Sequence, residues 1–258
     1  MNGMYAVERQ QAIAELVAQR GRQSVNELAD RYGVTTETVR RDLDVLERAA
    51  LLKRVHGGAV RMESVTALEL ALSDRAHEHT HEKDRIAKAA LEYLPSANGT
   101  VIVDAGSSTS RLVTMLPGDR PLRLLTNSVP IAARVAGSAN FTLHMLPGRV
   151  RPTTQAAVGD DLVAALSVLR ADVAFMGTNG ISMGHGFSTP DPGEAAAKRA
   201  MIASAHRVVV LADSSKFGVE TTVRFAALDE VDVVITDGGA DDHDVQALRD
   251  AGIEVVVA

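Results

Sequence analysis

The chain has 258 residues, of which 46% are hydrophobic and 23% are charged, and it contains no cysteine. This length favours two domains, and the lack of cysteine excludes a disulfide framework or a thiolate metal site. No segment approaches the roughly 18 uninterrupted apolar residues of a membrane span, and the N-terminus MNGMYAVERQ lacks the pattern of a secretory signal, so we expect a cytoplasmic protein without a membrane role.

The net charge of −6 is distributed unevenly. Residues 1–63 contain ten basic and nine acidic residues, whereas the rest of the chain contains 17 basic and 24 acidic ones. This balance argues against a protein that coats nucleic acid nonspecifically. A near-neutral N-terminal domain can still bind DNA if its basic side chains share one face, because the local field attracts phosphates.

Two helices are predicted at the start of the chain. Apolar spacing predicts the first over residues 7–20, with Gly21 as its C-cap. Ser24 followed by Glu27 is a capping-box pattern, which predicts a second, short helix that ends near Gly33.

A third helix and a hairpin follow. Thr35 or Thr36 is the expected N-cap of the helix TETVRRDLDVLERAA, in which apolar residues at spacings of four and three form an inward stripe. The next stretch, LLKRVHGGAV, is too short for a helix, and its pair Gly57–Gly58 predicts a tight turn between two strands. Two helices followed by such a hairpin are typical of a winged helix-turn-helix, whose second helix enters the major groove.

The polar side of this third helix carries the groups that DNA recognition needs. Thr36, Thr38, Arg40 and Arg41 offer hydroxyl groups and guanidinium forks that can reach phosphates and base edges. The alternative interpretation is a solvated amphipathic helix in a small helical bundle.

Three segments together resemble the DeoR family of bacterial transcription regulators. They are the helix run that starts at Arg9, the run TTETVRRDL and the run RVHGGAV, which stand in the order and spacing of that family. The resemblance implies that residues 24–43 form the helix-turn-helix. Asp42 belongs to the same signature and is expected to orient Arg40, Arg41 or a residue of the wing. The residues expected to contact double-stranded operator DNA are Ser24, Thr35, Thr36, Thr38, Arg40, Arg41, Lys53, Arg54 and His56.

Residues 61–82 have no regular periodicity and are predicted to be a polar linker. Their histidine-rich end, HEHTHE at 77–82, could supply metal ligands, but its place in a linker favours a solvated segment, so neither a metal site nor a cofactor is predicted. Aspartates near strand ends (Asp104, Asp172, Asp213 and Asp237) are interpreted as turn or cap residues.

Residues 83–258 have the pattern of an α/β domain. A helix is predicted from Lys83 to Tyr93, and short β-branched runs then alternate with helical stretches at 128–137, 159–167, 193–205 and 244–251. This alternation predicts a mostly parallel sheet covered by helices, with any ligand bound at the carboxyl ends of the strands.

The stretch VDAGSSTSRL joins a strand end to a helix start and resembles an anion-binding loop. Gly106 lets the backbone approach an anion, and the following hydroxyl groups add donors at the positive end of the helix. The stretch lacks the spacing of a P-loop or of a dinucleotide fingerprint. The alternative is an N-capped helix without a ligand.

Other strand ends carry similar polar groups, in LLTNS, MGTNGIS and LADSSKFG. Asn127 and Asn179 can bond sugar hydroxyls, and Lys198 and Lys216 can neutralise a phosphate. For Lys198 the alternative is an ordinary surface pair with Glu194 four residues earlier.

These segments, with GFSTPDPGEAAAKRAM, resemble the effector domain of the DeoR family, which is similar in fold to ribose-5-phosphate isomerase and to coenzyme A transferases. The resemblance implies that Gly106–Thr109 hold the phosphate of a sugar. Within the family, the chain most resembles actinobacterial regulators of sugar uptake, which makes fructose 1-phosphate the expected effector. The expected effector-binding residues are Asp104, Gly106, Ser107, Ser108, Thr109, Thr126, Asn127, Ser128, Asn179, Gly180, Glu194, Lys198 and Lys216.

The rival hypothesis is an isomerase that acts on a sugar phosphate. Isomerases of this fold carry an acid-rich turn after a central strand, whereas this chain has Gly177-Thr178-Asn179-Gly180, without the pair of carboxylates that would act as base and orienter. We therefore expect a ligand-responsive repressor and not an enzyme. It would be a homodimer or homotetramer, with a DNA-binding domain at 1–60, a linker at 61–82 and a sugar-phosphate sensor at 83–258.

Overall fold

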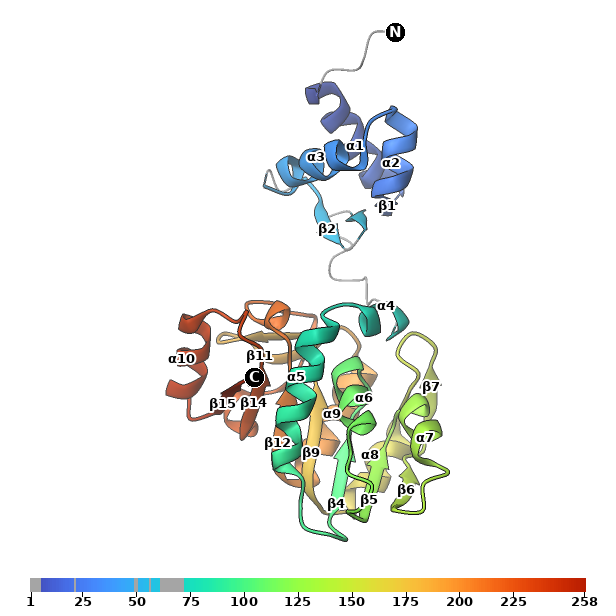
Figure 1. Ribbon diagram of the computed structural model, residues 1–258, viewed down its shortest axis with the longest axis vertical. Helices are drawn as coiled ribbons and strands as arrows, with labels where there is room; N and C mark the ends of the chain where they lie inside the picture. The colour runs from blue at the N-terminus through green and yellow to red at the C-terminus, as the bar shows by residue number, and fades with distance from the viewer. Residues whose placement is uncertain (1–5, 21, 49–50, 56, 61–71) are drawn as a thin grey trace. The chain divides into compact units, whose positions relative to one another are not determined.

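The computed structural model describes residues 6–20, 22–48, 51–55, 57–60 and 72–258. The chain divides into two compact units, Met1–Leu68 and Glu69–Ala258 (Figure 1). In the described ranges, no helix is both long enough and apolar enough to cross a bilayer.

The first unit is a winged helix-turn-helix. Its elements are α1 (Ala6–Arg20), β1 (Arg22–Ser24), α2 (Val25–Tyr32), α3 (Thr36–Arg48), β2 (Lys53–Val55) and β3 (Gly58–Val60). The strands form an antiparallel sheet in the order β1-β3-β2. The hairpin β2–β3 confirms the predicted wing, and β1 is an additional edge strand. A Cβ atom on Gly58 would lie 2.2 Å from the carbonyl oxygen of Gln23, so glycine is required where β3 passes β1.

Local signals set the helix ends of this unit. Ser24 and Glu27 form the predicted capping box, and Gly33 ends α2 in the left-handed conformation at φ 63°. The hydroxyl of Thr35 accepts the N–H of Thr38 at 3.2 Å, which makes Thr35 the cap of α3. The predicted inward stripe is buried with apolar residues of α1 and α2. The predicted cap Gly21 and the last two residues predicted for the third helix lie outside the described residues.

The second unit is built on a seven-stranded parallel sheet in the order β15-β14-β12-β9-β4-β5-β6. The strands are β4 (Thr100–Val103), β5 (Leu122–Thr126), β6 (Phe141–Met145), β9 (Ala171–Gly177), β12 (Ala205–Leu211), β14 (Val233–Thr236) and β15 (Glu254–Val257). The helices are α4 (Leu72–His77), α5 (Thr80–Ala90), α6 (Ser107–Thr114), α7 (Val129–Val135), α8 (Asp160–Ser167), α9 (Pro192–Ala203) and α10 (Asp242–Asp250).

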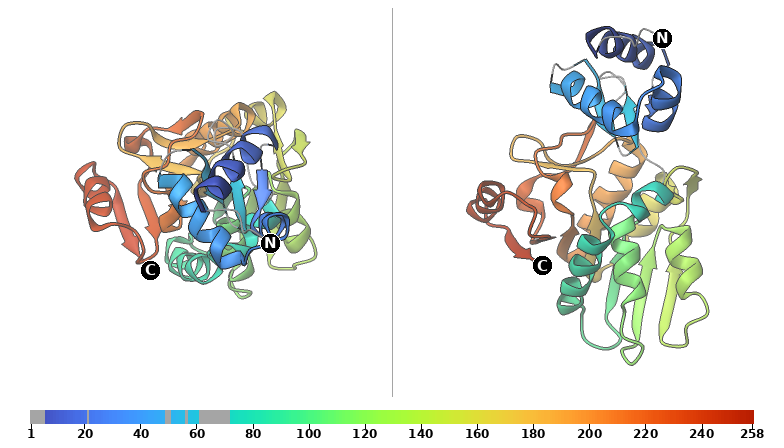
Figure 2. Two further views of the ribbon diagram at one scale, coloured as in Figure 1. Left: turned by 90° about the horizontal axis from the view of Figure 1, so that it is seen from above. Right: turned by 45° about the horizontal axis from the view of Figure 1, so that its top comes forward.

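Both faces of this sheet are covered, because alternate residues of the central strands enter different cores. Val173 and Phe175 of β9 pack with α5, α6 and α7, whereas Ala174 and Met176 pack with α8, α9 and α10. Helices accordingly lie on both faces of the sheet (Figure 2). The predicted α/β fold class is confirmed.

Two small sheets complete the unit. One is the hairpin of β7 (Arg149–Arg151) and β8 (Ala156–Val158), and the other consists of β10 (Gly180–Ser182), β11 (Gly186–Thr189) and β13 (Val223–Ala226). Short 3-10 turns cover Leu91–Tyr93, Ser214–Lys216 and Leu228–Glu230.

The predicted linker at 61–82 contains helical structure. All of α4 and the first three residues of α5 fall in this range, and the N–H of Leu72 donates to the carbonyl oxygen of Thr153 in the second unit at 3.0 Å. The run HEHTHEK looks like a linker because its side chains are largely outward, while the buried face of α5 begins only at Lys83. Residues 61–71 lie outside the described ranges.

Candidate functional site

The outer side of α3 carries the cations predicted to contact DNA. The side chains of Arg40 and Arg41 are 55% and 77% exposed, and their guanidinium groups lie 3.8 and 3.5 Å from the carboxylate of Glu37. The hydroxyls of Thr35 and Thr38 are hydrogen-bonded at 3.0 Å, and Thr36 begins the helix. The N-terminal half of α3 thus offers hydroxyl and guanidinium groups together.

The other predicted DNA contacts are spread around this helix. The hydroxyl of Ser24 accepts the N–H of Glu27 and donates to its carboxylate, so it belongs to the cap of α2. Lys53 and Arg54 lie in strand β2 of the wing. His56 lies outside the described residues.

Asp42 does not orient Arg40, Arg41 or the wing, so the role expected for it is wrong. It is buried, and its carboxylate accepts hydrogen bonds from Arg9 at 2.6 Å and from Gln10 at 2.9 Å. Both donors lie on α1. Asp42 therefore joins α1 to α3, because a carboxylate inside this core needs a cationic partner.

A pocket lies at the carboxyl ends of strands β4, β9 and β12. Its lining residues are Arg75, Lys83, Ala105, Gly106, Ser107, Ser108, Gly177, Thr178, Asn179, Glu194, Lys198, Leu211, Asp213 and Lys216. Seven of the thirteen predicted effector residues are among them. The cavity volume is about 30 Å³, room for two or three water molecules.

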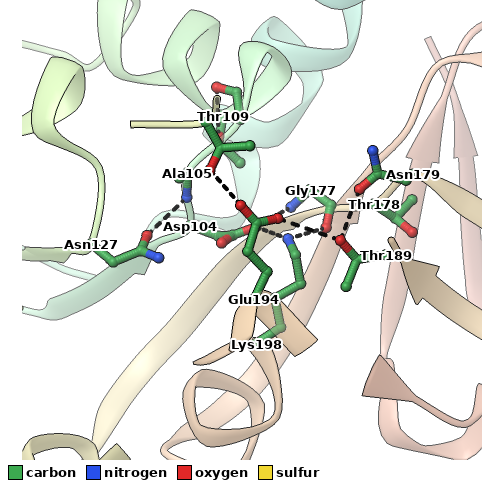
Figure 3. A network of polar contacts seen from close by, with 12 residues as sticks. Asp104, Ala105, Thr109, Asn127, Gly177, Thr178, Asn179, Thr189, Glu194 and Lys198 are labelled. Atoms are coloured by element: carbon green, nitrogen blue, oxygen red, sulfur yellow. Dashed lines mark hydrogen bonds and ion pairs between the residues drawn. The ribbon is translucent and has the colours of Figure 1, made fainter. Parts of the chain in front are cut away.

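Lys198, which lines the pocket, forms a buried ion pair with Asp104, which does not (Figure 3). The ammonium group of Lys198 also donates to the carbonyl oxygen of Gly177 at 2.8 Å, and the N–H of Gly177 donates to Asp104 at 3.0 Å. Burial raises the pKa of the Asp104 carboxyl, against the opposing effect of Lys198. The alternative of a surface pair between Lys198 and Glu194 is wrong, since both residues are buried.

Glu194 is held from three sides. Arg151 donates to its carboxylate at 2.5 Å, and the hydroxyls of Thr154 and Thr189 donate as well, the latter at 3.4 Å. Burial alone would raise the pKa of Glu194, but the charge of Lys198 and the contacts with Thr154 and Arg151 outweigh it and lower the pKa. Glu194 is therefore a carboxylate at neutral pH.

Several predicted effector residues support the pocket without lining it. Asn127 accepts the N–H of Ala105 at 3.0 Å and donates to the carbonyl of Ala157 at 3.1 Å, so its amide is used within the protein. The hydroxyl groups of Thr109, Thr126 and Ser128 bond nearby backbone groups.

Glycine at position 180 is explained by packing, and Asn179 by its contact with Thr189. A Cβ atom on Gly180 would lie 2.3 Å from the carbonyl oxygen of Val219. The amide oxygen of Asn179 accepts the hydroxyl of Thr189 at 3.1 Å, at the wall of the pocket.

Three charged lining residues were missed as effector contacts. Lys83 donates to the carbonyl oxygens of Arg75 and Glu78 at 2.6 and 2.7 Å, and burial lowers its pKa. Asp213 caps the turn that carries Lys216, and in the part of the chain that the structure describes, its Oδ2 atom has no hydrogen-bond partner. Arg75 lies in the segment predicted to be a linker, and the sequence alone indicates only a turn or cap role for Asp213.

No group of three or more His, Asp or Glu side chains in the described ranges is arranged to hold a metal ion. The pocket itself combines basic, acidic and amide groups with the backbone of a glycine-serine loop. Such a lining can bind a small anion that carries hydroxyl groups.

Comparisons with known proteins place both units. Residues 9–65 match the family model of the DeoR-like helix-turn-helix domain, and residues 78–238 match that of the DeoR C terminal sensor domain. The HTH-type transcriptional regulator GlpR of Haloferax volcanii is 35% identical, over 98% of both chains. The Glycerol-3-phosphate regulon repressor of Escherichia coli is 30% identical, over 98% of this chain and 99% of that one.

Among solved structures, ribose 5 phosphate isomerase A from Neisseria gonorrhoeae is similar over 52% of each chain, with 16% identity and a TM-score of 0.39. The first family model covers the helix-turn-helix and the second covers most of the second unit. The two curated relatives, which are named as a transcriptional regulator and a repressor, match over nearly their full length. The chain therefore belongs to the DeoR family, and it is a DNA-binding transcriptional regulator and not an enzyme.

Proposed function

We propose that the protein is a cytoplasmic repressor of genes for the uptake or breakdown of a sugar, and that a phosphorylated sugar releases it from its operator. The observation that carries the proposal is the charge of the pocket. Its described lining has four basic side chains, Arg75, Lys83, Lys198 and Lys216, and two acidic ones, Glu194 and Asp213. Even with Asp104 paired to Lys198, positive charge remains in excess, which suits a phosphate group.

The phosphate would bind at the start of α6. Gly106 is the N-cap of this helix, and no side chain of the described residues caps it. The first N–H groups of α6 therefore have no side-chain acceptor among the described residues. In α7 and α9, by contrast, the side chains of Ser128 and Asp191 accept one of these N–H groups. An anion at this place would receive these N–H groups, and Lys216 would add a compact charge.

The sugar would be recognised by acceptors in the same pocket. Oδ2 of Asp213 and the carboxylate of Glu194 can accept hydroxyl groups, and Asn179 lies on the opposite strand end. We propose fructose 1-phosphate as the effector, and glycerol 3-phosphate, which the name of the Escherichia coli relative suggests, as the second candidate.

The DNA-binding part of the proposal rests on α3 and the wing, within residues 1–60. Thr38, Arg40 and Arg41 would contact the operator from the N-terminal half of α3, and the wing would contact the backbone. A homodimer or homotetramer would place two such units on paired half-sites.

A thermal-shift screen with the full-length protein tests the sensor. Fructose 1-phosphate and glycerol 3-phosphate are compared with fructose, glycerol and inorganic phosphate. A ligand at 100 times its dissociation constant adds about 2.7 kcal/mol of stability, which raises the melting temperature of the second unit. The proposal fails if no phosphorylated compound stabilises the protein more than inorganic phosphate does.

Release from DNA is the second half of the test. With a duplex selected for binding from a random pool, the stabilising compound should weaken DNA binding, and DNA should weaken binding of that compound by the same factor. Equal affinities with and without DNA would contradict induction by this route. The matched variant Lys216→Gln should weaken binding of the compound and leave DNA affinity in its absence unchanged.

A further inference from the structure

The β7–β8 hairpin is hydrogen-bonded to two neighbouring elements, the end of β5 and the start of α7. Its strand β8 exchanges hydrogen bonds with the end of β5, because the N–H of Ala157 donates to the carbonyl of Asn127 at 2.7 Å and the side chain of Asn127 donates back at 3.1 Å. The carbonyl of Gln155 accepts the N–H of Val129 at the start of α7, at 3.0 Å. The hairpin is thus fixed to β5, the strand next to β4, which leads into the glycine-serine loop.

Arg151 reaches from this hairpin into the pocket wall. Its guanidinium group lies 2.5 Å from the carboxylate of Glu194 and 3.3 Å from that of Asp191, both at the start of α9. It also donates to the hydroxyl of Thr154 at 3.4 Å, and that hydroxyl bonds Glu194 in turn. Arg151 is 15% exposed, so these charged contacts are largely shielded from water.

The turn of the same hairpin contacts α4. The carbonyl of Thr153 accepts the N–H of Leu72, the first residue of α4, at 3.0 Å. Thr153 directly precedes Thr154, so the residue that bonds Glu194 and the residue that bonds α4 are neighbours in the chain. In sequence, α4 follows residues 61–71, which lead back to the DNA-binding unit.

We propose that Arg151 is a positioning residue of the effector site, and that the β7–β8 hairpin transmits occupancy of the pocket from Glu194 to α4. The inference rests on the proposed function for its ligand. The contacts from Glu194 through Thr154 and Thr153 to Leu72 all lie within the described residues.

The hairpin would respond to a ligand through Glu194. The cavity of about 30 Å³ has room for two or three water molecules, so a sugar phosphate bound there would extend out of it or displace side chains of its lining. Hydroxyl groups that reach Glu194 compete with Arg151 and Thr154 for the same carboxylate oxygens. A shift of Arg151 carries the turn with it, because the N–H of Gln155 donates to the carbonyl of Arg151 at 2.8 Å and closes the turn.

Gln155 in this turn adopts the left-handed conformation at φ 52°, which is uncommon for a residue other than glycine. In the proposed connection the turn follows Arg151, and the carbonyl of Thr153 would change its position against Leu72.

Hydrogen exchange of α4 in the ligand-free, full-length chain tests the connection without any ligand. Arg151→Met should speed exchange of the amides of residues 72–77 about tenfold, because the turn that accepts the first amide loses its link to Glu194 and Asp191. Arg149→Met is the matched control, since it removes an exposed arginine from the same strand. Equal exchange of α4 in the Arg151→Met and Arg149→Met variants would overturn the inference.

A second pair of variants acts at the other end of the connection. Leu72→Pro and Leu72→Ala both remove the leucine side chain, but only proline also removes the N–H that Thr153 accepts, and proline fits the first turn of a helix. In a chain saturated with fructose 1-phosphate, the exchange change in residues 73–77 should persist with alanine and disappear with proline. Persistence in both variants would contradict transmission through this bond.

The ligand experiment separates this inference from the proposed function. If neither fructose 1-phosphate nor glycerol 3-phosphate binds the wild-type chain, the proposed function fails, and the ligand-free exchange result still decides the connection. If Arg151→Met binds the compound and α4 responds as in wild type, the signal reaches α4 directly through Arg75, and the hairpin connection is wrong.

Discussion

The ammonium group of Lys198 contacts the carboxylate of Asp104 inside the second unit, where the two side chains are 5% and 2% exposed. Asp104 directly follows strand β4, and Lys198 lies on α9, 94 residues later. The pair therefore joins the strand that leads to the phosphate loop with the helix that carries Glu194. The ion pair thus holds the end of β4 and α9 together where they border the pocket.

Asp104→Asn should destabilise the second unit by about 3 to 5 kcal/mol, because it leaves the ammonium of Lys198 buried without its counter-charge. Urea denaturation of the full-length chain measures the loss. The double variant Asp104→Leu with Lys198→Met should recover most of it, since apolar groups replace both charges. A loss below about 1 kcal/mol in the single variant would mean that the pair is held in its neutral form.

In the first unit, the ion pair between Arg9 and Asp42 predicts that DNA binding can be lost while effector binding is kept. Asp42→Asn should unfold the helix-turn-helix at a lower temperature and abolish DNA binding, because Arg9 loses its buried partner. Stabilisation by the sugar phosphate should persist, since the pocket belongs to the second unit. Asp30→Asn, on the exposed side of α2, serves as control. Retained DNA binding in Asp42→Asn would contradict the structural role of the pair.

Sequence reasoning was most successful where the signal is local. The cap at Ser24, the turn at Gly33 and the glycine-serine loop after β4 depend on residues within a few positions of each other, and the structure has them as predicted. The alternation of strands and helices likewise follows from patterns inside each element.

The remaining features depend on contacts between distant parts of the chain. Arg151 reaches Glu194 across 43 residues, and Lys83 lines the same pocket as Asp213. Nothing in the neighbouring sequence of Lys83 or Arg151 predicts this, because only the folded sheet brings these segments together. Asn127 was predicted at the right strand end, but its amide bonds the backbone of Ala105 and Ala157 instead of lining the pocket.

The exposed arginines of α3 predict a salt-dependent loss of DNA binding. Arg41→Ala should weaken binding to the selected duplex and reduce the slope of log affinity against log salt by about 1, as expected when one phosphate contact is lost. Glu37→Gln should have the opposite effect, because it removes the carboxylate that lies near both Arg40 and Arg41. Fluorescence anisotropy at several salt concentrations checks both. An unchanged slope in Arg41→Ala would exclude this guanidinium from the phosphate contacts.

The hydrogen bonds of Asp237 predict how low pH affects the stability of the turn Ser214–Lys216. Its carboxylate accepts the N–H groups of Ser214 and Gly239 at 2.7 and 2.9 Å. Burial alone would raise the pKa of Asp237, but these backbone donors outweigh it and lower the pKa below the ordinary value of 3.8. A carboxyl whose pKa is lower in the folded state stabilises the fold above its ordinary pKa, and this contribution disappears as the pH falls through the folded-state pKa.

Asp237→Asn should therefore cost about 1 to 3 kcal/mol of stability at pH 7, since hydrogen bonds to a charged acceptor are lost. The difference from wild type should shrink as the pH falls from 3.8 through the lower folded-state pKa of Asp237, where the wild-type carboxyl becomes protonated in the folded protein. Urea denaturation at a series of pH values measures it, with the exposed Asp119→Asn as control. A difference that stays constant down to the acid transition would show that the charge of Asp237 does not hold the loop.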